Sequence, residues 1–269
     1  MKIGKETIPK TSICTANEET IIVRGEDLCH DLIGKVSFTE YFLLLLTGSR
    51  PSPALHAIVD AALVAIAEHG LVPSVQASRM TFAAAPESLQ GAVAAGLLGC
   101  GSVILGAADQ AGQLLTEIDQ HAEHEHVSLQ QAAYAVVSAR RAVRSALPGY
   151  GHPVHKERDP RVSALFNAAR QARGNTRYIE IAELVEQIIP EIYGKQLKLN
   201  VSAAIPAVLL GAGFPLQALK GIPILARTAG LLAHLHEEQQ KSIGFALSHQ
   251  ATHTLTYEGK APEGFQPSK

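Results

Sequence analysis

The segment 149–161, with the sequence GYGHPVHKERDPR, gathers imidazole, ammonium and guanidinium groups in a short stretch that also contains two prolines. Lys156, Arg158 and Arg161 are cationic hydrogen-bond donors, and such groups suit an anionic ligand with carboxylate or phosphate oxygens. His152 stands directly after a glycine, where the chain can turn. The composition fits an anion-binding segment, and it also fits a solvated basic loop.

A second histidine, His69, follows a long apolar-periodic segment in the sequence AEHG. An imidazole has an ordinary pKa of about 6.5, so a fixed histidine can donate a hydrogen bond or act as an acid near neutral pH. The same position also fits a histidine that caps the end of a helix and interacts favourably with the helix dipole. The residues alone leave both interpretations open.

Two further stretches have residue types that bind metal ions or phosphate groups in other proteins. In the tract HAEHEH, His121 and His124 are three residues apart, which is compatible with metal ligands on one helical face. The tract lacks a nearby cysteine and the His-Glu-x-x-His pattern, so we favour a solvated loop between helices and predict no metal site. The glycine-rich segment 96–109 matches neither the dinucleotide fingerprint nor the P-loop, and both a phosphate cradle and close helix packing stay open.

Composition limits the class of protein. The chain has 269 residues, 46% of them hydrophobic and 18% charged, which is typical of a globular protein with a sizeable core. A net charge of -2 gives no electrostatic reason to expect nucleic acid as a partner, and no apolar run is long enough to predict a membrane span. Residues 1–10 are polar and the three cysteines are far apart, so we expect a cytoplasmic protein without a disulfide framework.

The elements that must position these residues are predicted to be helices. Short β-branched runs in residues 10–24 predict a small hairpin, and beyond them apolar residues recur with helical spacing. Ser37 followed by Glu40 predicts a capping box at the start of one helix. The helical segments are 25–34, 37–48, 52–70, 74–86, 87–101, 106–125, 128–143, 161–173, 178–193, 201–213 and 215–240, and the tail 252–269 has one short strand candidate. The sequence therefore predicts an all-α fold with a small N-terminal β hairpin.

We expect two unequal parts in this fold. The helices of 123–177 are shorter and more polar, which predicts a small helical lobe that carries the segment 149–161. Residues 1–122 and 178–269 then form the large helical domain. The helices around 80–98 are rich in alanine and glycine and too apolar for the surface of a monomer, so we expect a homodimer or a dimer-based tetramer.

Six blocks of the sequence, taken in order, resemble the citrate synthase superfamily. They lie at 11–48, 67–74 (AEHGLVPS), 88–115, 149–161, 197–209 (LKLNVSAAIPAVL) and 223–238 (PILARTAGLLAHLHEE). The chain looks most like the short citryl-CoA lyase module, which also forms the C-terminal part of ATP-citrate lyase. Like the lyase modules, it lacks at 104 and 105 the histidine that citrate synthases proper carry there. The resemblance implies a citrate synthase-like multi-helix fold.

The chemistry that this resemblance implies is the making or breaking of a carbon–carbon bond beside a thioester. An acetyl-CoA enolate is the shared intermediate, and it requires a base on carbon and a hydrogen-bond donor on oxygen. By resemblance, His69 donates to the thioester oxygen and His152 holds the oxo-acid or citryl group. The ligand-binding positions implied in the same way are Arg161 and Arg227 for carboxylates, and Gly101, Gly106, Lys156 and Arg158 for coenzyme A. A coenzyme A thioester is then a substrate, and no tightly bound cofactor is expected.

Two departures from the family pattern bear on activity. Ser202, in LNVSAA, stands where the family has its catalytic aspartate, and a hydroxyl is a poor base without help from a neighbouring base. Pro153 replaces an arginine that follows the substrate histidine, which removes one carboxylate partner. The first hypothesis is a citryl-CoA lyase-like or citrate synthase-like enzyme that acts on an acyl-CoA and an oxo-acid such as oxaloacetate. The alternative is a catalytically impaired relative that binds acyl-CoA.

Overall fold

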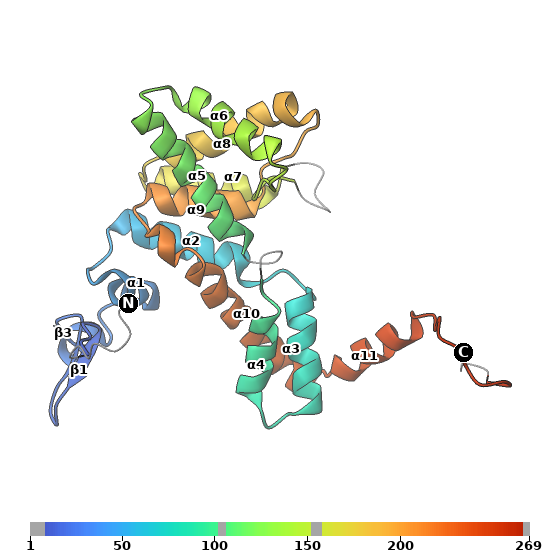
Figure 1. The fold of residues 1–269 in the computed structure, drawn as a ribbon. Coiled ribbons are helices and arrows are strands. Elements are labelled where there is room, and N and C mark those ends of the chain that lie inside the picture. Colours follow the sequence, from blue (N-terminus) through green and yellow to red (C-terminus); the bar gives the residue numbers. More distant parts are fainter. Residues whose placement is uncertain (1–8, 102–105, 152–157, 266–269) are drawn as a thin grey trace.

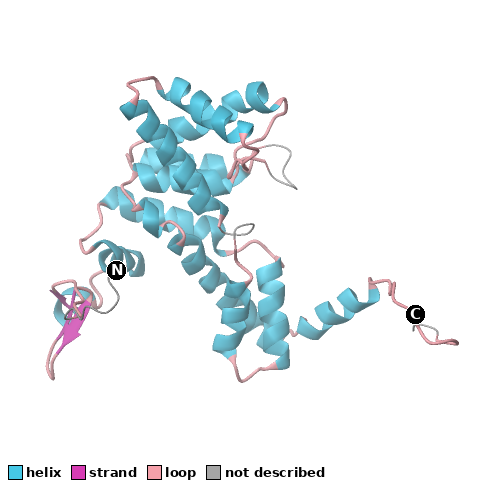
Figure 2. Cartoon of the chain, in the orientation of Figure 1, coloured by secondary structure: helices cyan, strands magenta, loops and turns pink. Residues whose placement is uncertain are grey.

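The computed structural model of the protein describes residues 9–101, 106–151 and 158–265. Over these residues the chain folds into helices, apart from one small antiparallel sheet near the N-terminus (Figures 1 and 2). The predicted all-α class is therefore confirmed. In this described part, the helices are too short or too polar to cross a lipid bilayer.

The predicted N-terminal β structure is present and contains a third strand. The strands pair antiparallel in chain order, as β1 (Cys14–Ala16), β2 (Ile21–Val23) and β3 (Glu26–Asp27). Arg24 and Gly25 have φ angles of 52° and 90°, and their left-handed conformation makes the tight turn that returns the chain as β3. The helix predicted over 25–34 is wrong in its first part for this reason. A short π-helical turn, η1 (Leu28–Leu32), follows the strand and is capped by the side chain of Asp27.

The α-helices lie close to the predicted segments. Those of the described residues are α1 (Phe38–Thr47), α2 (Pro53–Ala67), α3 (Pro73–Ala84), α4 (Leu89–Leu98), α5 (Ala107–His124), α6 (Leu129–Ala142), α7 (Pro160–Gln171), α8 (Arg177–Tyr193), α9 (Val201–Gly211), α10 (Gly221–Gln240) and α11 (Gly244–His253), with a 3-10 turn η2 (Leu216–Ala218) before α10. The predicted capping box is confirmed: Ser37 Oγ accepts from the N–H of Glu40, and the Glu40 carboxylate accepts from the N–H of Ser37. The helix that they start ends at Gly48, which adopts the left-handed conformation usual for a helix stop.

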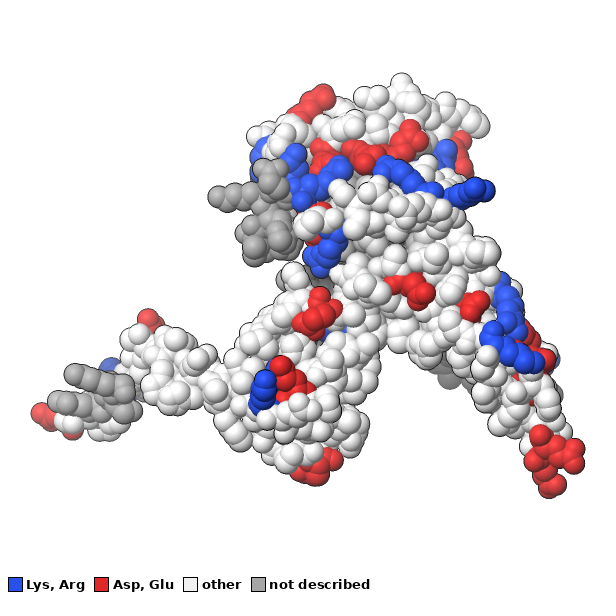
Figure 3. All heavy atoms as spheres, turned by 180° about the vertical axis from the view of Figure 1, so that it is seen from behind, with Lys and Arg blue, Asp and Glu red and all other residues white. Residues whose placement is uncertain are grey.

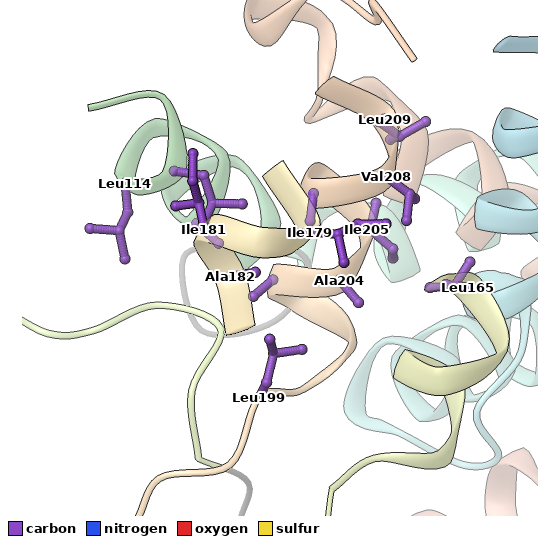
Figure 4. Close-up of a cluster of buried hydrophobic side chains, with 14 of the residues drawn as sticks. Leu114, Leu165, Ile179, Ile181, Ala182, Leu199, Ala204, Ile205, Val208 and Leu209 are labelled. Atoms are coloured by element: carbon purple, nitrogen blue, oxygen red, sulfur yellow. The ribbon is translucent and has the colours of Figure 1, made fainter. Parts of the chain in front are cut away.

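One hydrophobic core holds α2 and α5 to α9 together. Figure 4 shows part of it, with Leu165 of α7, Ile181 of α8 and Ile205 of α9 among the buried side chains. In this core α5 packs on α6 and α9, α7 packs on α2 and α9, and α8 packs on α6 and α9. The helices of the predicted lobe, 123–177, thus share the core of their neighbours, and packing marks no boundary at either end. The division into a large domain and a lobe stays a prediction.

A second group of helices extends from this body. α10 packs on α2 and also on α3 and α4, and Figure 1 shows it running from the body towards that helix pair. α11 packs on α3 and leads into the C-terminal tail, on the opposite side of the molecule from the N-terminal sheet. α11 was not predicted. The strand candidate in the tail is not formed in the described residues 254–265.

The histidine tract is helical at its start, as predicted by the segment 106–125, and the solvated loop predicted for HAEHEH is wrong for these residues. α5 continues to His124, so His121 and His124 lie in its last turn and the predicted loop begins only after them. Ala122 within the tract is buried in the hydrophobic core, which favours a continued helix over a solvated loop here. Among the described residues, no group of His, Cys, Asp and Glu side chains is arranged to hold a metal ion.

Charged side chains of both signs lie side by side on the helical body. Figure 3 shows Lys, Arg, Asp and Glu interleaved in a belt across the part that contains α5 to α9, with fewer on the part that contains α3 and α4. Ion pairs in that body include Arg158 with Glu186 and Arg177 with Asp119. Because the signs alternate, the face in view offers no broad cationic surface among its described residues.

Candidate active site

A short antiparallel pairing brings two of the predicted site segments together. Residues 149–151 pair with 198–200 through backbone hydrogen bonds of 2.7 and 3.0 Å. On one strand the next residue is His152, and on the other α9 begins at once. The pairing therefore fixes where the segment of His152 starts relative to the first turn of α9. His152 and Lys156 themselves lie outside the described residues, as does Pro153.

The close approach of this pairing to α9 depends on Gly149. Its φ angle is 86°, a conformation that favours glycine. A Cβ at this position would lie 2.4 Å from the Cβ of Ala203 and 2.9 Å from its backbone nitrogen. The first glycine of the GYGH sequence is thus required by packing as well as by the turn.

Ser202, at the predicted catalytic position, is the second residue of α9 and is half-buried. The N-cap is Asn200, whose side-chain oxygen accepts from the N–H of Ser202 at 2.9 Å and whose amide donates to the carbonyl of Gly151 at 2.6 Å. The N-terminus of a helix carries partial positive charge and stabilises a nearby anion. Within the described part of the chain, no side chain hydrogen-bonds to the Ser202 hydroxyl.

Asp159 caps the start of α7 and binds the guanidinium of Arg161. Asp159 is 1% exposed. Its carboxylate accepts from the backbone N–H of Arg161 at 3.0 Å and from the guanidinium of Arg161 at 3.0 and 2.8 Å. The N–H of Val201 also faces this carboxylate. Burial acts to raise the pKa of Asp159, but these donors outweigh it and hold the pKa below its ordinary value. Arg161 also reaches the carbonyl of Ala65 in α2 at 3.5 Å, about one helical turn before His69. Arg161 thus lies between two predicted site elements, and its role towards a carboxylate stays a prediction.

His69 lies in an exposed turn directly after α2. The helix ends at Ala67, Glu68 is extended, and Gly70 has a φ angle of 70°. α10 closes on this turn from one side, because a Cβ at Gly230 would lie 2.0 Å from the carbonyl oxygen of Ala67. The histidine is therefore held beyond the helix end, on a turn that two helices position.

Arg227 of α10 is buried close to this turn. It is 4% exposed, and its Nε and Nη1 have no hydrogen-bond partner among the described residues. The hydroxyls of Ser74 and Ser78, one helical turn apart on α3, are likewise buried without a described partner. Burial raises the pKa of the Cys100 thiol, which faces both Ser74 and Arg227. Since a buried guanidinium without acceptors is costly, the group formed by Ser74, Cys100 and Arg227 has the chemistry of an anion site.

The positions predicted to bind coenzyme A have different surroundings. The N–H of Gly106 donates to the carbonyl of Gly101 at 2.9 Å, which holds these two glycines together directly before α5. Residues 102–105 lie outside the described part. Arg158 pairs with Glu186, and the other oxygen of that carboxylate accepts from the N–H of Leu199 at 2.8 Å. Arg158 therefore supports the pairing of 198–200, and its contact with coenzyme A stays a prediction.

A separate cavity of about 160 Å³ lies in the N-terminal part, between η1 and α1. Its lining includes Leu32, Ile33, Phe38 and Tyr41, and no predicted site residue belongs to it. The candidate active site is therefore separate from this cavity.

Sequence reasoning missed several residues that shape the site. Asp159 and Asn200 stood within the quoted motifs DPR and LNV, and both are helix N-caps. Their side-chain type directly before a helical segment was a usable signal. Ser74 and Ser78 carry no such signal, because what distinguishes them is burial beside α10, which depends on the tertiary fold.

Comparison with known proteins places this architecture in a class. The family model described as citrate synthase, C-terminal domain, matches residues 9–244. The chain is 28% identical over 210 residues to citrate synthase from Synechocystis sp., covering 76% of this chain and 50% of that protein. It is 29% identical over 240 residues to citrate/2-methylcitrate synthase from Bacillus subtilis, covering 87% of this chain and 60% of that protein. The chain thus spans about half to three-fifths of the length of these curated relatives.

Solved structures agree with this class. Citryl-CoA lyase from Hydrogenobacter thermophilus has a TM-score of 0.82 and 31% identity, with 97% of this chain and 98% of that chain covered. ATP citrate lyase from Methanothrix soehngenii, solved with citrate and coenzyme A, has the same fold over 99% of this chain and 44% of that chain, with a TM-score of 0.76 and 22% identity. The helical fold is that of the citrate synthases. The chain belongs to the citrate synthase family, as the six sequence blocks predicted.

Proposed function

We propose that the protein is a citryl-CoA lyase-like enzyme, which cleaves or forms the carbon–carbon bond between an acyl-CoA enolate and an oxo-acid such as oxaloacetate. The observation that carries this proposal is the buried guanidinium of Arg227, with two nitrogens that have no partner in the described residues. A citryl group supplies carboxylates for such a guanidinium. The match to citryl-CoA lyase over nearly the full length of both chains supports the lyase-like assignment.

In the cleavage direction the proton of the citryl hydroxyl leaves and the bond between the carbinol carbon and the methylene carbon breaks. The products are an oxo-acid and a thioester enolate, which takes up a proton on carbon to give acetyl-CoA. In our proposal His69 donates to the enolate oxygen, and Arg161 and Arg227 bind carboxylates. His152 holds the oxo-acid group. Because Ser202 is a weak base, we expect the step that interconverts the enolate and the methyl group of acetyl-CoA to be slow in both directions.

The proposal is tested by following acetyl-CoA and oxaloacetate release from citryl-CoA. We expect release by the wild-type protein. Arg227→Met should raise KM about 10- to 100-fold, since a hydrogen bond to a charged group contributes about 1.5–3 kcal/mol. Arg170→Met, at an exposed position of α7, is the matched control and should behave as wild type. Binding of acyl-CoA without release would favour the impaired relative, and neither binding nor release would refute the proposal.

We also propose a homodimer or a dimer-based tetramer. The support is a set of exposed apolar side chains on the helix group that extends from the body, namely Leu89 and Leu98 of α4, Ile224 and Leu232 of α10 and Phe245 of α11. Light scattering at low micromolar concentration should give at least twice the mass of the chain. A monodisperse monomer would contradict this.

A further inference from the structure

One face of α10 packs against the turn that contains His69. The close approach at Gly230, where a Cβ would lie 2.0 Å from the carbonyl oxygen of Ala67, fixes this face against the end of α2. His234 follows Gly230 by four residues, so its side chain projects from the same face one helical turn further on. The side chain is 15% exposed and reaches Glu68, the residue directly before His69.

The two ring nitrogens of His234 have different partners. Nε2 lies 2.9 Å from Glu68 Oε2, and Nδ1 lies 3.3 Å from Nη1 of Arg79. A guanidinium has only donors, so Nδ1 must accept and the ring proton must be on Nε2. His234 therefore donates to Glu68 in one defined neutral tautomer.

Arg79 can set that tautomer because it is itself immobilised. Its side chain is 3% exposed, Nε donates to Glu238 Oε2 at 2.6 Å and Nη1 donates to Glu237 Oε2 at 2.7 Å. Nη2 donates to the carbonyl of Lys241 at 3.1 Å. A guanidinium held by three acceptor groups has no freedom to follow a displaced histidine, so the ring position is defined by α3 and α10.

Glu68 connects the fixed His234 ring to the turn of His69 through hydrogen bonds. One carboxylate oxygen accepts from His234 and the other accepts from the N–H of Gly70, so the carboxylate bridges across His69. Burial acts to raise the pKa of Glu68, but the hydrogen bonds from His234 and Gly70 outweigh it and lower the pKa below its ordinary value. Glu68 is thus an ionised acceptor at neutral pH.

We propose that His234 is a positioning residue, which holds the turn of His69 through Glu68 and so sets the direction of the His69 imidazole. The proposal rests on the proposed function in one respect, namely that His69 acts on the substrate. A purely structural alternative is that Arg79, His234 and Glu68 only fasten α10 to α3 and to the end of α2. The positioning role requires that loss of the hydrogen bond from His234 to Glu68 affects His69. The structural role predicts that loss of either hydrogen bond of His234 lowers stability only.

Two substitutions separate these hydrogen bonds. In His234→Gln the side-chain amide can occupy the place of Nε2 and keep the donor to Glu68, whereas the acceptor for Arg79 is lost. In His234→Asn the side-chain oxygen can occupy the place of Nδ1 and keep the acceptor for Arg79, whereas the donor to Glu68 is lost. His236→Asn is the control, because that exposed ring contacts Gln240 on the same helix.

We expect His234→Asn to lower kcat for citryl-CoA cleavage about 10- to 100-fold with KM within about twofold, since a small misplacement of an acting group costs up to about 10²-fold. His234→Gln should keep kcat within about threefold, although we expect both variants to lose stability in urea unfolding. If kcat instead follows stability, or if both variants lose kcat equally, the positioning role is overturned.

A second readout does not depend on activity. With ¹³C-labelled histidine, the Cε1 signal of His69, assigned by its absence in His69→Gln, should shift in His234→Asn and stay in place in His234→Gln and His236→Asn. An unchanged His69 signal in His234→Asn would refute the proposal. If the wild-type protein neither cleaves citryl-CoA nor exchanges acetyl-CoA protons, the proposed function fails, and the His69 signal still decides the positioning role.

Discussion

Replacing Ser202 with aspartate should accelerate the exchange of the methyl protons of acetyl-CoA into deuterated water. Position 202 is half-buried in the first turn of α9, where Asn200 holds the backbone N–H. No hydrogen bond from the described residues helps to deprotonate the serine hydroxyl, so enolate formation lacks a strong base there. The carboxylate of Ser202→Asp is such a base at neutral pH.

Two opposing effects determine the size of the gain. A positioned general base contributes about 10²–10⁴-fold to a proton transfer. The helix N-terminus stabilises the carboxylate by about 0.3–1 kcal/mol and weakens it as a base, which costs about two- to fivefold. The first effect is larger, so exchange should rise on the order of 10²–10³-fold.

The measurement is loss of the acetyl methyl signal in the proton NMR spectrum of acetyl-CoA in deuterated buffer. Ser202→Asn is the matched control, because it has nearly the size of aspartate and no basic oxygen at neutral pH, and it should exchange no faster than wild type. If wild type already exchanges as fast as Ser202→Asp, another residue is the base and the reasoning is refuted. If neither exchanges although acetyl-CoA binds, the enolate chemistry is absent and the binding-protein alternative gains support.

Three further predictions follow from particular contacts. Gly149→Ala should destabilise the protein by about 3 kcal/mol in urea unfolding, because the new methyl group would lie 2.4 Å from the Cβ of Ala203 and the φ angle of 86° is strained for a residue other than glycine. A loss of stability below about 1 kcal/mol would show that α9 can move aside. Asp159→Asn should cost about 3 kcal/mol at pH 7, since it leaves Arg161 without its buried partner. The folded-state pKa of Asp159 is lowered, so the contribution of its carboxylate to stability is complete above about pH 4 and is lost as the pH falls through that pKa. The difference in unfolding free energy between wild type and Asp159→Asn should therefore be equal at pH 7 and pH 5 and smaller at pH 3. A larger difference at pH 3 would contradict this. Saturating acetyl-CoA or citryl-CoA should raise Tm, with about 2.7 kcal/mol gained at a concentration 100 times Kd, and an unchanged Tm would argue against thioester binding.

Local signals in the sequence predicted much of the helical framework. Ser37 with Glu40 predicted a helix start that the structure confirms, because a capping box depends on residues three apart. The third strand was missed, since it depends on the left-handed pair Arg24 and Gly25 more than on strand propensity. The end of α5 agrees with the predicted helical segment 106–125, whereas the loop predicted for the histidine tract is wrong over 121–124, because Ala122 within the tract is buried in the core.

The site was predictable where it follows a motif and unpredictable where it depends on distant contacts. The segments of His152 and Ser202 were singled out by sequence, yet the pairing of 149–151 with 198–200 joins residues about fifty positions apart. α11 was missed for a similar reason. Its start is capped by Glu238, which accepts from the N–H groups of Ile243 and Gly244 at 2.9 and 2.8 Å while it also binds Arg79 of α3.

The ion pair between Arg79 and Glu238 also constrains the order in which the chain can fold during synthesis. The two residues are 159 positions apart, so α3 leaves the ribosome long before its counter-charge exists. Burying a lone guanidinium costs several kcal/mol, and α3 therefore has no stable buried position until α10 has been made. The body of α2 and α5 to α9 can form its core earlier, because those helices bury apolar side chains against each other. The helix pair α3 and α4 should then dock last, and until that moment its alanine-rich surface is open to chaperones and to other nascent chains.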